Sequence, residues 1–232
     1  MTGPRGRING AAGGASGRFV VGRAILPGTR SARHRGLQDR DPRDREDTGR
    51  QVRIKSYLTS TTNNKMPEAF VSSTLAEARQ MCDRGELPHK ILTHLAEAAE
   101  QLAPERDAVA SILVLDKDGL LRNGASPRLP YDYLTAIDGL KPNAQVGTCA
   151  AVAATGTMII TPDFHSDDKW AELRHLPLAL GFVAAWSYPI KDSKGAVLGT
   201  FGTYFRNNRE PLPGEIKGVE AFAGMAAEVL GR

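Results

Sequence analysis

Apolar residues recur at helical spacing near both ends of residues 66–232. The four residues Thr74–Glu77 have the form of a capping box, which predicts the start of a short helix. A second helix is expected to begin at Pro88, because proline suits the first helical turn. The apolar positions from Ile216 to Leu230 predict a terminal amphipathic helix. The pattern therefore places two helices at the start of this segment and one at its end.

Between these helices, two pairs of apolar runs flank tight-turn sequences, as the strands of β-hairpins do. The pairs are Ala108–Leu115 with Leu120–Ala125, and Val183–Ile190 with Ala196–Phe205. A further short strand is expected at Met158–Thr161. Because runs of adjacent strands are bracketed by helices, the order favours an antiparallel α+β domain over a parallel α/β sheet.

Three short helices are expected between and beside the strands. They are Tyr131–Leu140, Cys149–Thr155 and Asp167–Leu176. Pro177 is expected to limit the third of them. Residues 66–232 are numerous enough to form one domain with a sizeable core.

Residues 1–65 show no sustained helical or alternating pattern and are rich in Gly, Arg, Ser and Asp. They hold fourteen Lys and Arg against five Asp and Glu, whereas residues 66–232 hold sixteen against twenty-one. We expect residues 1–65 to be a disordered basic leader, because they cannot bury enough apolar surface to offset their ordering entropy. The mildly acidic remainder argues against nucleic-acid binding through a broad basic face.

Three explanations for the basic leader stay open at this point. It could be a tail that contacts nucleic acid, although its interleaved acids weaken that idea. It could be a transit peptide, although such peptides are poor in acidic residues. The favoured explanation is that the native protein starts at Met66 and that the leader is translated upstream sequence. Arginine outnumbers lysine twelve to two in this segment, which is typical of a compositional artefact.

The apolar stretches and the cysteines indicate in which cellular compartment the protein is expected. The longest apolar stretches, such as Ala108–Leu115, are far too short to span a bilayer, and no secretory signal pattern is present. The two cysteines, Cys82 and Cys149, cannot make a disulfide framework. We therefore expect a cytoplasmic protein that does not associate with membranes.

Common catalytic motifs, such as a phosphate loop, a nucleophile elbow or a zinc-protease HExxH, are absent from the sequence. Cys149 starts a predicted helix, where backbone amides could lower the pKa of its thiol. The residues that follow it are small and apolar, however, and such a cysteine is usually a small buried hydrophobe. We therefore expect Cys149 to be structural and expect no catalytic residues.

An acidic cluster surrounds Asp163 and includes Asp167, Asp168 and Glu172. Paired carboxylates could act as acid and base or hold a cation. The spacing of an EF-hand is missing, and Ser166 or Asp167 more simply caps a helix that carries Trp170. No metal site is predicted.

Four segments carry a resemblance to a known family. They are SILVLDKDGLLRNGASPRLP, VGTCAAVAATGT, MIITPDFHSDDKWAEL and AAWSYPIKDSKGAVLGTFGTYF. In order and spacing they resemble a GAF domain, the small sensory module of bacterial regulators, over most of residues 73–231. The resemblance implies a central antiparallel sheet, with the first and last helices on one face and a small-molecule pocket on the other. It does not identify the ligand or any cofactor, because sites are grafted onto folds.

The pocket of the family is bounded by the second hairpin, by the turn and helix from Gly147, and by residues 163–170. Strand alternation places Ala184, Trp186 and Tyr188 on one face. We expect a ligand to contact residues from these segments: Trp186 as a stacking wall, Thr148 as a donor, and Cys149, Asp163, Phe164, Trp170, Tyr188 and Phe201 around them. An anion or a compact polar metabolite is favoured over haem, because helix N-terminal amides are expected near Cys149.

The resemblance implies a sensory domain that binds a small molecule and is not an enzyme. Its output would pass through a regulatory partner protein or through a homodimer that pairs by the first and last helices. One alternative is a redox enzyme similar to the free methionine sulfoxide reductases with this fold, although no second cysteine lies near Cys149 in the sequence. Another is a structural dimerisation module whose pocket is filled by side chains.

Overall fold

The computed structural model describes residues 65–104 and 108–232. In this part of the chain, five strands form one antiparallel sheet in the order β2-β1-β5-β4-β3. The strands are β1 (Val109–Leu115), β2 (Leu121–Ala125), β3 (Ile159–Thr161), β4 (Ala184–Lys191) and β5 (Val197–Phe205). Both predicted hairpins are present, and the expected antiparallel α+β architecture is confirmed.

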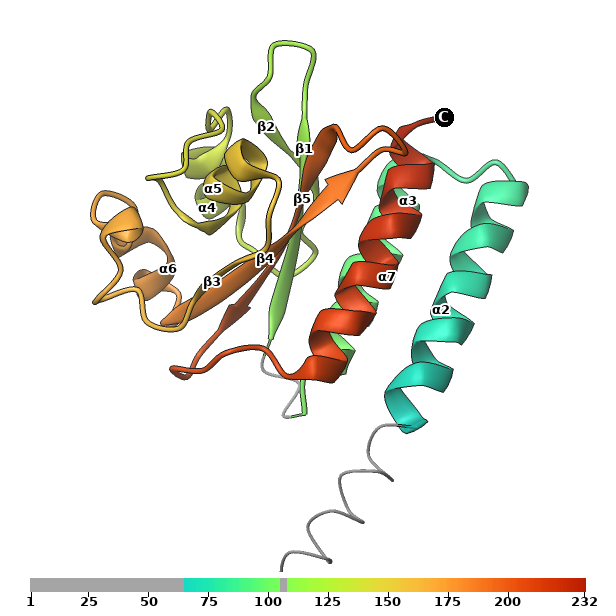
Figure 1. Ribbon diagram of the computed structural model, residues 1–232, viewed down its shortest axis with the longest axis horizontal. Helices are drawn as coiled ribbons and strands as arrows, with labels where there is room; N and C mark the ends of the chain where they lie inside the picture. The colour runs from blue at the N-terminus through green and yellow to red at the C-terminus, as the bar shows by residue number, and fades with distance from the viewer. Residues whose placement is uncertain (1–64, 105–107) are drawn as a thin grey trace, which may run out of the picture. The chain divides into compact units, whose positions relative to one another are not determined.

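One face of the sheet carries three helices: α2 (Lys65–Asp83), α3 (Pro88–Leu102) and α7 (Pro213–Leu230). Figure 1 shows α7 and α3 lying along the sheet and α2 on their outer side. The helix α2 packs mainly on α3 and α7, whereas α3 and α7 also contact strands. The expectation that the first and last helices share one face is confirmed.

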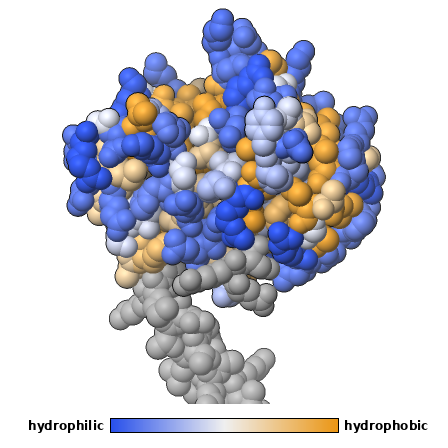
Figure 2. Space-filling model, turned by 180° about the vertical axis from the view of Figure 1, so that it is seen from behind, coloured by the Kyte–Doolittle hydropathy of each residue, from blue (hydrophilic) through white to orange (hydrophobic). Residues whose placement is uncertain are grey.

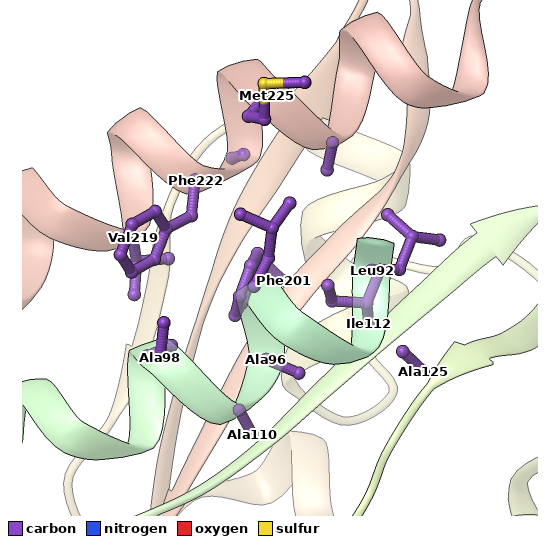
Figure 3. Close-up of a cluster of buried hydrophobic side chains, with 14 of the residues drawn as sticks. Leu92, Ala96, Ala98, Ala110, Ile112, Ala125, Phe201, Val219, Phe222 and Met225 are labelled. Atoms are coloured by element: carbon purple, nitrogen blue, oxygen red, sulfur yellow. The ribbon is translucent and has the colours of Figure 1, made fainter. Parts of the chain in front are cut away.

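A core of apolar side chains fills the space between these helices and the sheet (Figure 3). Phe222 of α7 and Phe201 of β5 are completely buried, and Leu92 of α3 lies beside Ile112 of β1. Each such side chain stabilises the fold by roughly 1.5–3 kcal/mol through the apolar area that it removes from water. This core fixes the sheet against the three helices.

The opposite face of the sheet carries shorter helices. They are α4 (Tyr131–Ile137), α5 (Thr148–Thr155), the 3₁₀ helix η1 (Asp168–Trp170) and α6 (His175–Ala179). A second apolar cluster joins them to the sheet and includes Leu113, Phe164, Trp170 and Tyr204. The sheet therefore separates two cores, and the candidate pocket belongs to the second.

The capping box predicted at Thr74 is wrong, because α2 begins nine residues earlier. Thr74 lies inside this helix, and its hydroxyl donates to the carbonyl of Phe70 over 3.0 Å. A threonine that bonds to the carbonyl four residues back is compatible with a helix interior, so the motif carried no start signal here.

The single helix predicted at residues 167–176 is also wrong. Asp167 caps the short helix η1, because its carboxylate accepts from the amide of Lys169 over 2.9 Å. A turn follows, and α6 begins only at His175. Pro177 lies in the first turn of α6, where its missing N–H has no intrahelical partner to lose, so it does not end the helix.

The expected disorder of residues 1–64 lies outside the described residues, and a native start at Met66 stays a prediction. The division into a leader at 1–65 and a domain at 66–232 stays a prediction.

Candidate functional site

A small cavity lies on the sheet face that carries the short helices. Its volume is about 20 Å³, which is room for about one water molecule. Most of its wall is apolar and comes from β1, α4 and the segments around η1: Leu113, Ile137, Leu140, Val146, Leu173 and Leu176. The cavity therefore lies where the family resemblance places a pocket.

Five side chains with a polar atom also line this cavity. They are Tyr133, Thr148, Cys149, Trp170 and Tyr204. Among the residues that the structure describes, no Asp, Glu, Lys, Arg or His lines it. The site can therefore form hydrogen bonds with a ligand but offers no compensating charge.

Gly147 sets the position of Thr148 in the wall. Its φ of 55° lies in the left-handed region, which glycine adopts without strain, and its amide donates to the carbonyl of Lys169 over 2.7 Å. The first residue of α5, Thr148, is thereby held beside η1. Its hydroxyl accepts a hydrogen bond from Nε1 of Trp170 over 3.0 Å.

The hydroxyl of Thr148 also belongs to a longer chain of hydrogen bonds. It donates to Oγ1 of Thr161 over 3.4 Å, and Thr161 donates to Oδ2 of Asp167 over 2.9 Å. The ammonium of Lys169 contacts both carboxylate oxygens of Asp167 at 2.8 Å. Burial raises the pKa of Asp167, but the hydrogen bonds from Lys169 and Thr161 outweigh it and hold that pKa below its ordinary value. Hydrogen bonds thus connect the cavity wall to the partly buried ion pair of Asp167 and Lys169.

Tyr133 and Tyr204 form the second polar feature of the cavity. Their hydroxyl oxygens lie 3.0 Å apart, and their rings meet edge to face with centroids 6.0 Å apart. Burial is the main cause that raises the pKa of both phenols well above the usual value. Both hydroxyls are therefore neutral at physiological pH.

Cys149 packs directly on the sheet, above a glycine. A Cβ on Gly202 would come within 2.9 Å of its sulfur, so the missing side chain lets α5 approach β5. Burial raises the pKa of the Cys149 thiol, and the nearby hydroxyls of Ser187 and Thr200 offset only part of this. The start of α5 therefore does not lower the pKa of this thiol, unlike one of the possibilities raised by the sequence.

Trp186, Tyr188 and Phe201 do not line the cavity, because these side chains lie on the other face of the sheet. Trp186 and Phe201 are buried in the core beneath α3 and α7, and Tyr188 packs against the same core. The hydroxyl of Tyr188 donates to Glu220 of α7 over 2.7 Å. Trp186 and Tyr188 share a face as the alternation predicts, but that face carries the long helices.

Asp163 and Phe164 do not line the cavity either. The carboxylate of Asp163 accepts from the amide of His165 over 2.9 Å and so stabilises a turn. Phe164 is fully buried and stacks on Trp170 with ring centroids 4.2 Å apart, which makes it a support behind the wall. The structure thus brings together at the cavity only Thr148, Cys149 and Trp170 of the expected residues.

Tyr133, Tyr204 and the lining leucines were missed from the sequence. Tyr204 carried a usable signal, because its position in the strand puts it on the same face as Thr200 and Gly202, opposite Phe201. Tyr133 carried none, since its neighbour in space is 71 residues away.

Within the described ranges, no three His, Cys, Asp or Glu side chains come together in a way that could hold a metal ion. No helix in the same ranges combines the length and the apolarity that crossing a membrane requires.

Comparison with known families and proteins agrees with this architecture. The family model described as "GAF domain" matches residues 86–230. A curated relative, the methyl sulfide methyltransferase-associated sensor of Methanosarcina acetivorans, is 28% identical over 188 residues. That alignment covers 79% of this chain but only 18% of the sensor, so the chain spans less than a fifth of its relative.

Two solved structures show the same fold at low identity. The GAF domain of an Acinetobacter phosphoenolpyruvate-protein phosphotransferase has a TM-score of 0.53 and 12% identity, over 69% of this chain and 92% of that one. The fRMsr of Staphylococcus aureus, in its reduced form, has a TM-score of 0.55 and 12% identity, over 71% and 94%. At such identities the likeness extends to the fold alone.

Proposed function

Because the chain belongs to the GAF domain family, we propose that residues 66–232 form a sensory module that binds a small molecule beneath α4, α5 and η1. The observation that carries this proposal is the cavity itself, which is walled by Thr148, Trp170 and the Tyr133–Tyr204 pair. The curated relative is a sensor, which supports a regulatory role.

We propose that the protein is not an enzyme. The alternative, a cysteine-dependent methionine sulfoxide reductase, needs a reactive thiolate and a second thiol to resolve its oxidised form. The whole chain has two cysteines, Cys82 and Cys149, and these lie in the two different cores on opposite faces of the sheet. Burial also raises the pKa of the Cys149 thiol. These observations favour the sensor over the reductase.

The output of such a sensor requires a partner. We propose that it acts through a second copy of the chain or through a regulatory protein that binds the layer formed by α2, α3 and α7. The two free thiols suit a reducing compartment, so a cytoplasmic location is proposed as well.

The test is native mass spectrometry of freshly purified full-length protein, in search of a retained small molecule. Ala150 lines the cavity on α5, so Ala150→Leu should fill it and abolish retention. Ala154→Leu, on the exposed side of the same helix, is the matched control and should retain the molecule. Turnover of free methionine sulfoxide with a thiol reductant, lost in Cys149→Ala, would instead establish the reductase.

A further inference from the structure

We infer that the ligand of this cavity is a small, uncharged and mostly apolar molecule with one hydrogen-bond acceptor, of the class of simple ketones. This inference rests on the proposed function, because it names the chemistry that the same cavity recognises. It replaces the anion or compact polar metabolite favoured from the sequence.

The absence of charge in the wall is the first argument. The described residues that line the cavity are leucines, small apolar residues and neutral polar side chains. The nearest cation in the hydrogen-bond chain, Lys169, is already engaged by both carboxylate oxygens of Asp167. A buried anion without a paired cation loses its hydration and gains no compensation, so the wall selects against carboxylates and phosphates.

The second argument is an unused donor. Tyr133 and Tyr204 are only 5% and 4% exposed, and each carries one hydroxyl proton. The bond between the two oxygens uses one of these protons, and neither hydroxyl has another hydrogen-bond partner in the part of the chain that the structure describes. One O–H at the cavity therefore lacks an acceptor, which is costly for a buried group. A carbonyl oxygen of a ligand would satisfy it.

The other polar groups of the wall are already occupied. The hydroxyl of Thr148 accepts from Trp170 and donates to Thr161, so it has no proton left for a ligand. The thiol of Cys149 lies among the hydroxyls of Ser187 and Thr200 and is a weak donor. The tyrosine pair is thus the donor that remains, which is why one acceptor atom is inferred.

The third argument is the apolar surface over the cavity. Leu140, Leu173 and Leu176 line the cavity and are only half-buried, so the same side chains also form part of the molecular surface. In Figure 2, where the side that carries α4 and α6 lies on the right, apolar surface is visible there among polar atoms. Because the cavity has a volume of only about 20 Å³, these leucines must move to admit more than a water-sized molecule. A small ligand requires only a limited movement of these leucines, and an apolar ligand matches the apolar surface that they form.

The experiment compares three six-membered rings of similar size: cyclohexanone, cyclohexane and cyclohexanecarboxylate. Binding to the full-length protein is followed by NMR on the two tryptophan indole N–H signals, assigned with Trp170→Phe. The indole of Trp170 bonds to Thr148 in the wall, whereas Trp186 lies beyond the sheet and serves as the internal reference. We expect cyclohexanone to shift the Trp170 signal at the lowest concentration and cyclohexanecarboxylate to leave it unchanged.

Removal of the donor tests the hydrogen bond. Either tyrosine alone keeps one O–H without an acceptor, so the test removes both hydroxyls. The double variant Tyr133→Phe/Tyr204→Phe should weaken cyclohexanone binding about tenfold and leave cyclohexane binding unchanged, since only the ketone uses the hydroxyl. The single variant Tyr133→Phe keeps the free O–H of Tyr204 and should retain cyclohexanone binding. If the double variant does not fold, loss of ketone binding in this single variant would contradict the inference. Tyr188→Phe is the matched control, because its hydroxyl bonds to Glu220 on the opposite face.

Three outcomes would overturn the inference. Tighter binding of cyclohexanecarboxylate at the Trp170 signal would leave the proposed function intact and show that the ligand class is wrong. An equal loss of ketone and hydrocarbon binding in the double tyrosine variant would show that the pair acts only by packing. If no ring shifts the Trp170 signal, the inference fails, and the proposed function is then decided by its own retention experiment.

Discussion

Thr148 and Trp170 are 22 residues apart in the chain and are joined by a buried hydrogen bond of 3.0 Å between the indole Nε1 and the threonine Oγ1. This bond connects the first residue of α5 to η1, and both side chains line the cavity. The hydrogen bond therefore holds together two parts of the cavity wall that come from separate segments of the chain.

Replacement of Thr148 by valine should therefore destabilise the fold. The shape of the side chain is kept, but the indole N–H of Trp170 loses its buried acceptor, which costs roughly 1–3 kcal/mol. Urea denaturation would measure the loss in the free energy of unfolding. Thr148→Ser retains the hydroxyl and should recover much of it, and equal stability of the two variants would contradict the role given to the hydrogen bond.

A methyl group added at Gly202 should also destabilise the protein, because a Cβ there would lie 2.9 Å from the sulfur of Cys149. Overpacking of this kind costs roughly 1–3 kcal/mol. Cys149→Ala removes the sulfur, so the double variant should be more stable than the sum of the two single losses predicts. Thermal or urea unfolding of all four proteins gives the coupling energy, and strict additivity would show that the two residues do not press on each other.

Acid should weaken the protein through Asp167. Hydrogen bonds hold its folded pKa below the ordinary value, which is about 3.9 in an unfolded chain. Its contribution to stability is therefore complete above the unfolded pKa and is lost as the pH falls through the folded pKa. The advantage of the wild type over Asp167→Asn should be constant above about pH 5 and shrink below about pH 4.

Urea titrations at several pH values test this expectation. Asp168→Asn removes an exposed neighbouring carboxylate and is the matched control for the loss of one negative charge. A wild-type advantage over Asp167→Asn that persists unchanged at pH 2 would show that the carboxylate does not act through its charge.

Trp186→Phe should leave ligand responses intact, contrary to the expectation from the sequence. Trp186 is 1% exposed and lies in the core beneath the long helices, so the sheet separates it from the cavity. Tryptophan fluorescence on addition of cyclohexanone should change through Trp170, and Trp170→Phe should remove most of that change. Loss of the response in Trp186→Phe would instead indicate that the ligand binds on the face of the sheet that carries α3 and α7.

Most of the helices and strands of this protein were predictable from the sequence, but two helix boundaries were not. The two hairpins and the terminal helix depend on apolar periodicity and turn residues, which act between neighbours in the chain. The capping box at Thr74 failed because the same hydroxyl can bond within a helix, to Phe70. The single helix predicted at residues 167–176 is wrong because contacts with distant residues fix the short helix η1: Asp167 accepts from Thr161, and Trp170 donates to Thr148.

The sequence by itself determined which residues of each strand share a face. It could not determine which layer of helices each face receives, because alternation is the same whether a face is covered by α7 or by α5. That choice was made by close approaches between distant segments, such as Cys149 over Gly202 and Tyr133 against Tyr204. Such contacts depend on how the side chains of residues far apart in the chain fit together and form hydrogen bonds. Only the tertiary structure could therefore place Trp186 in a core and Tyr204 at the cavity.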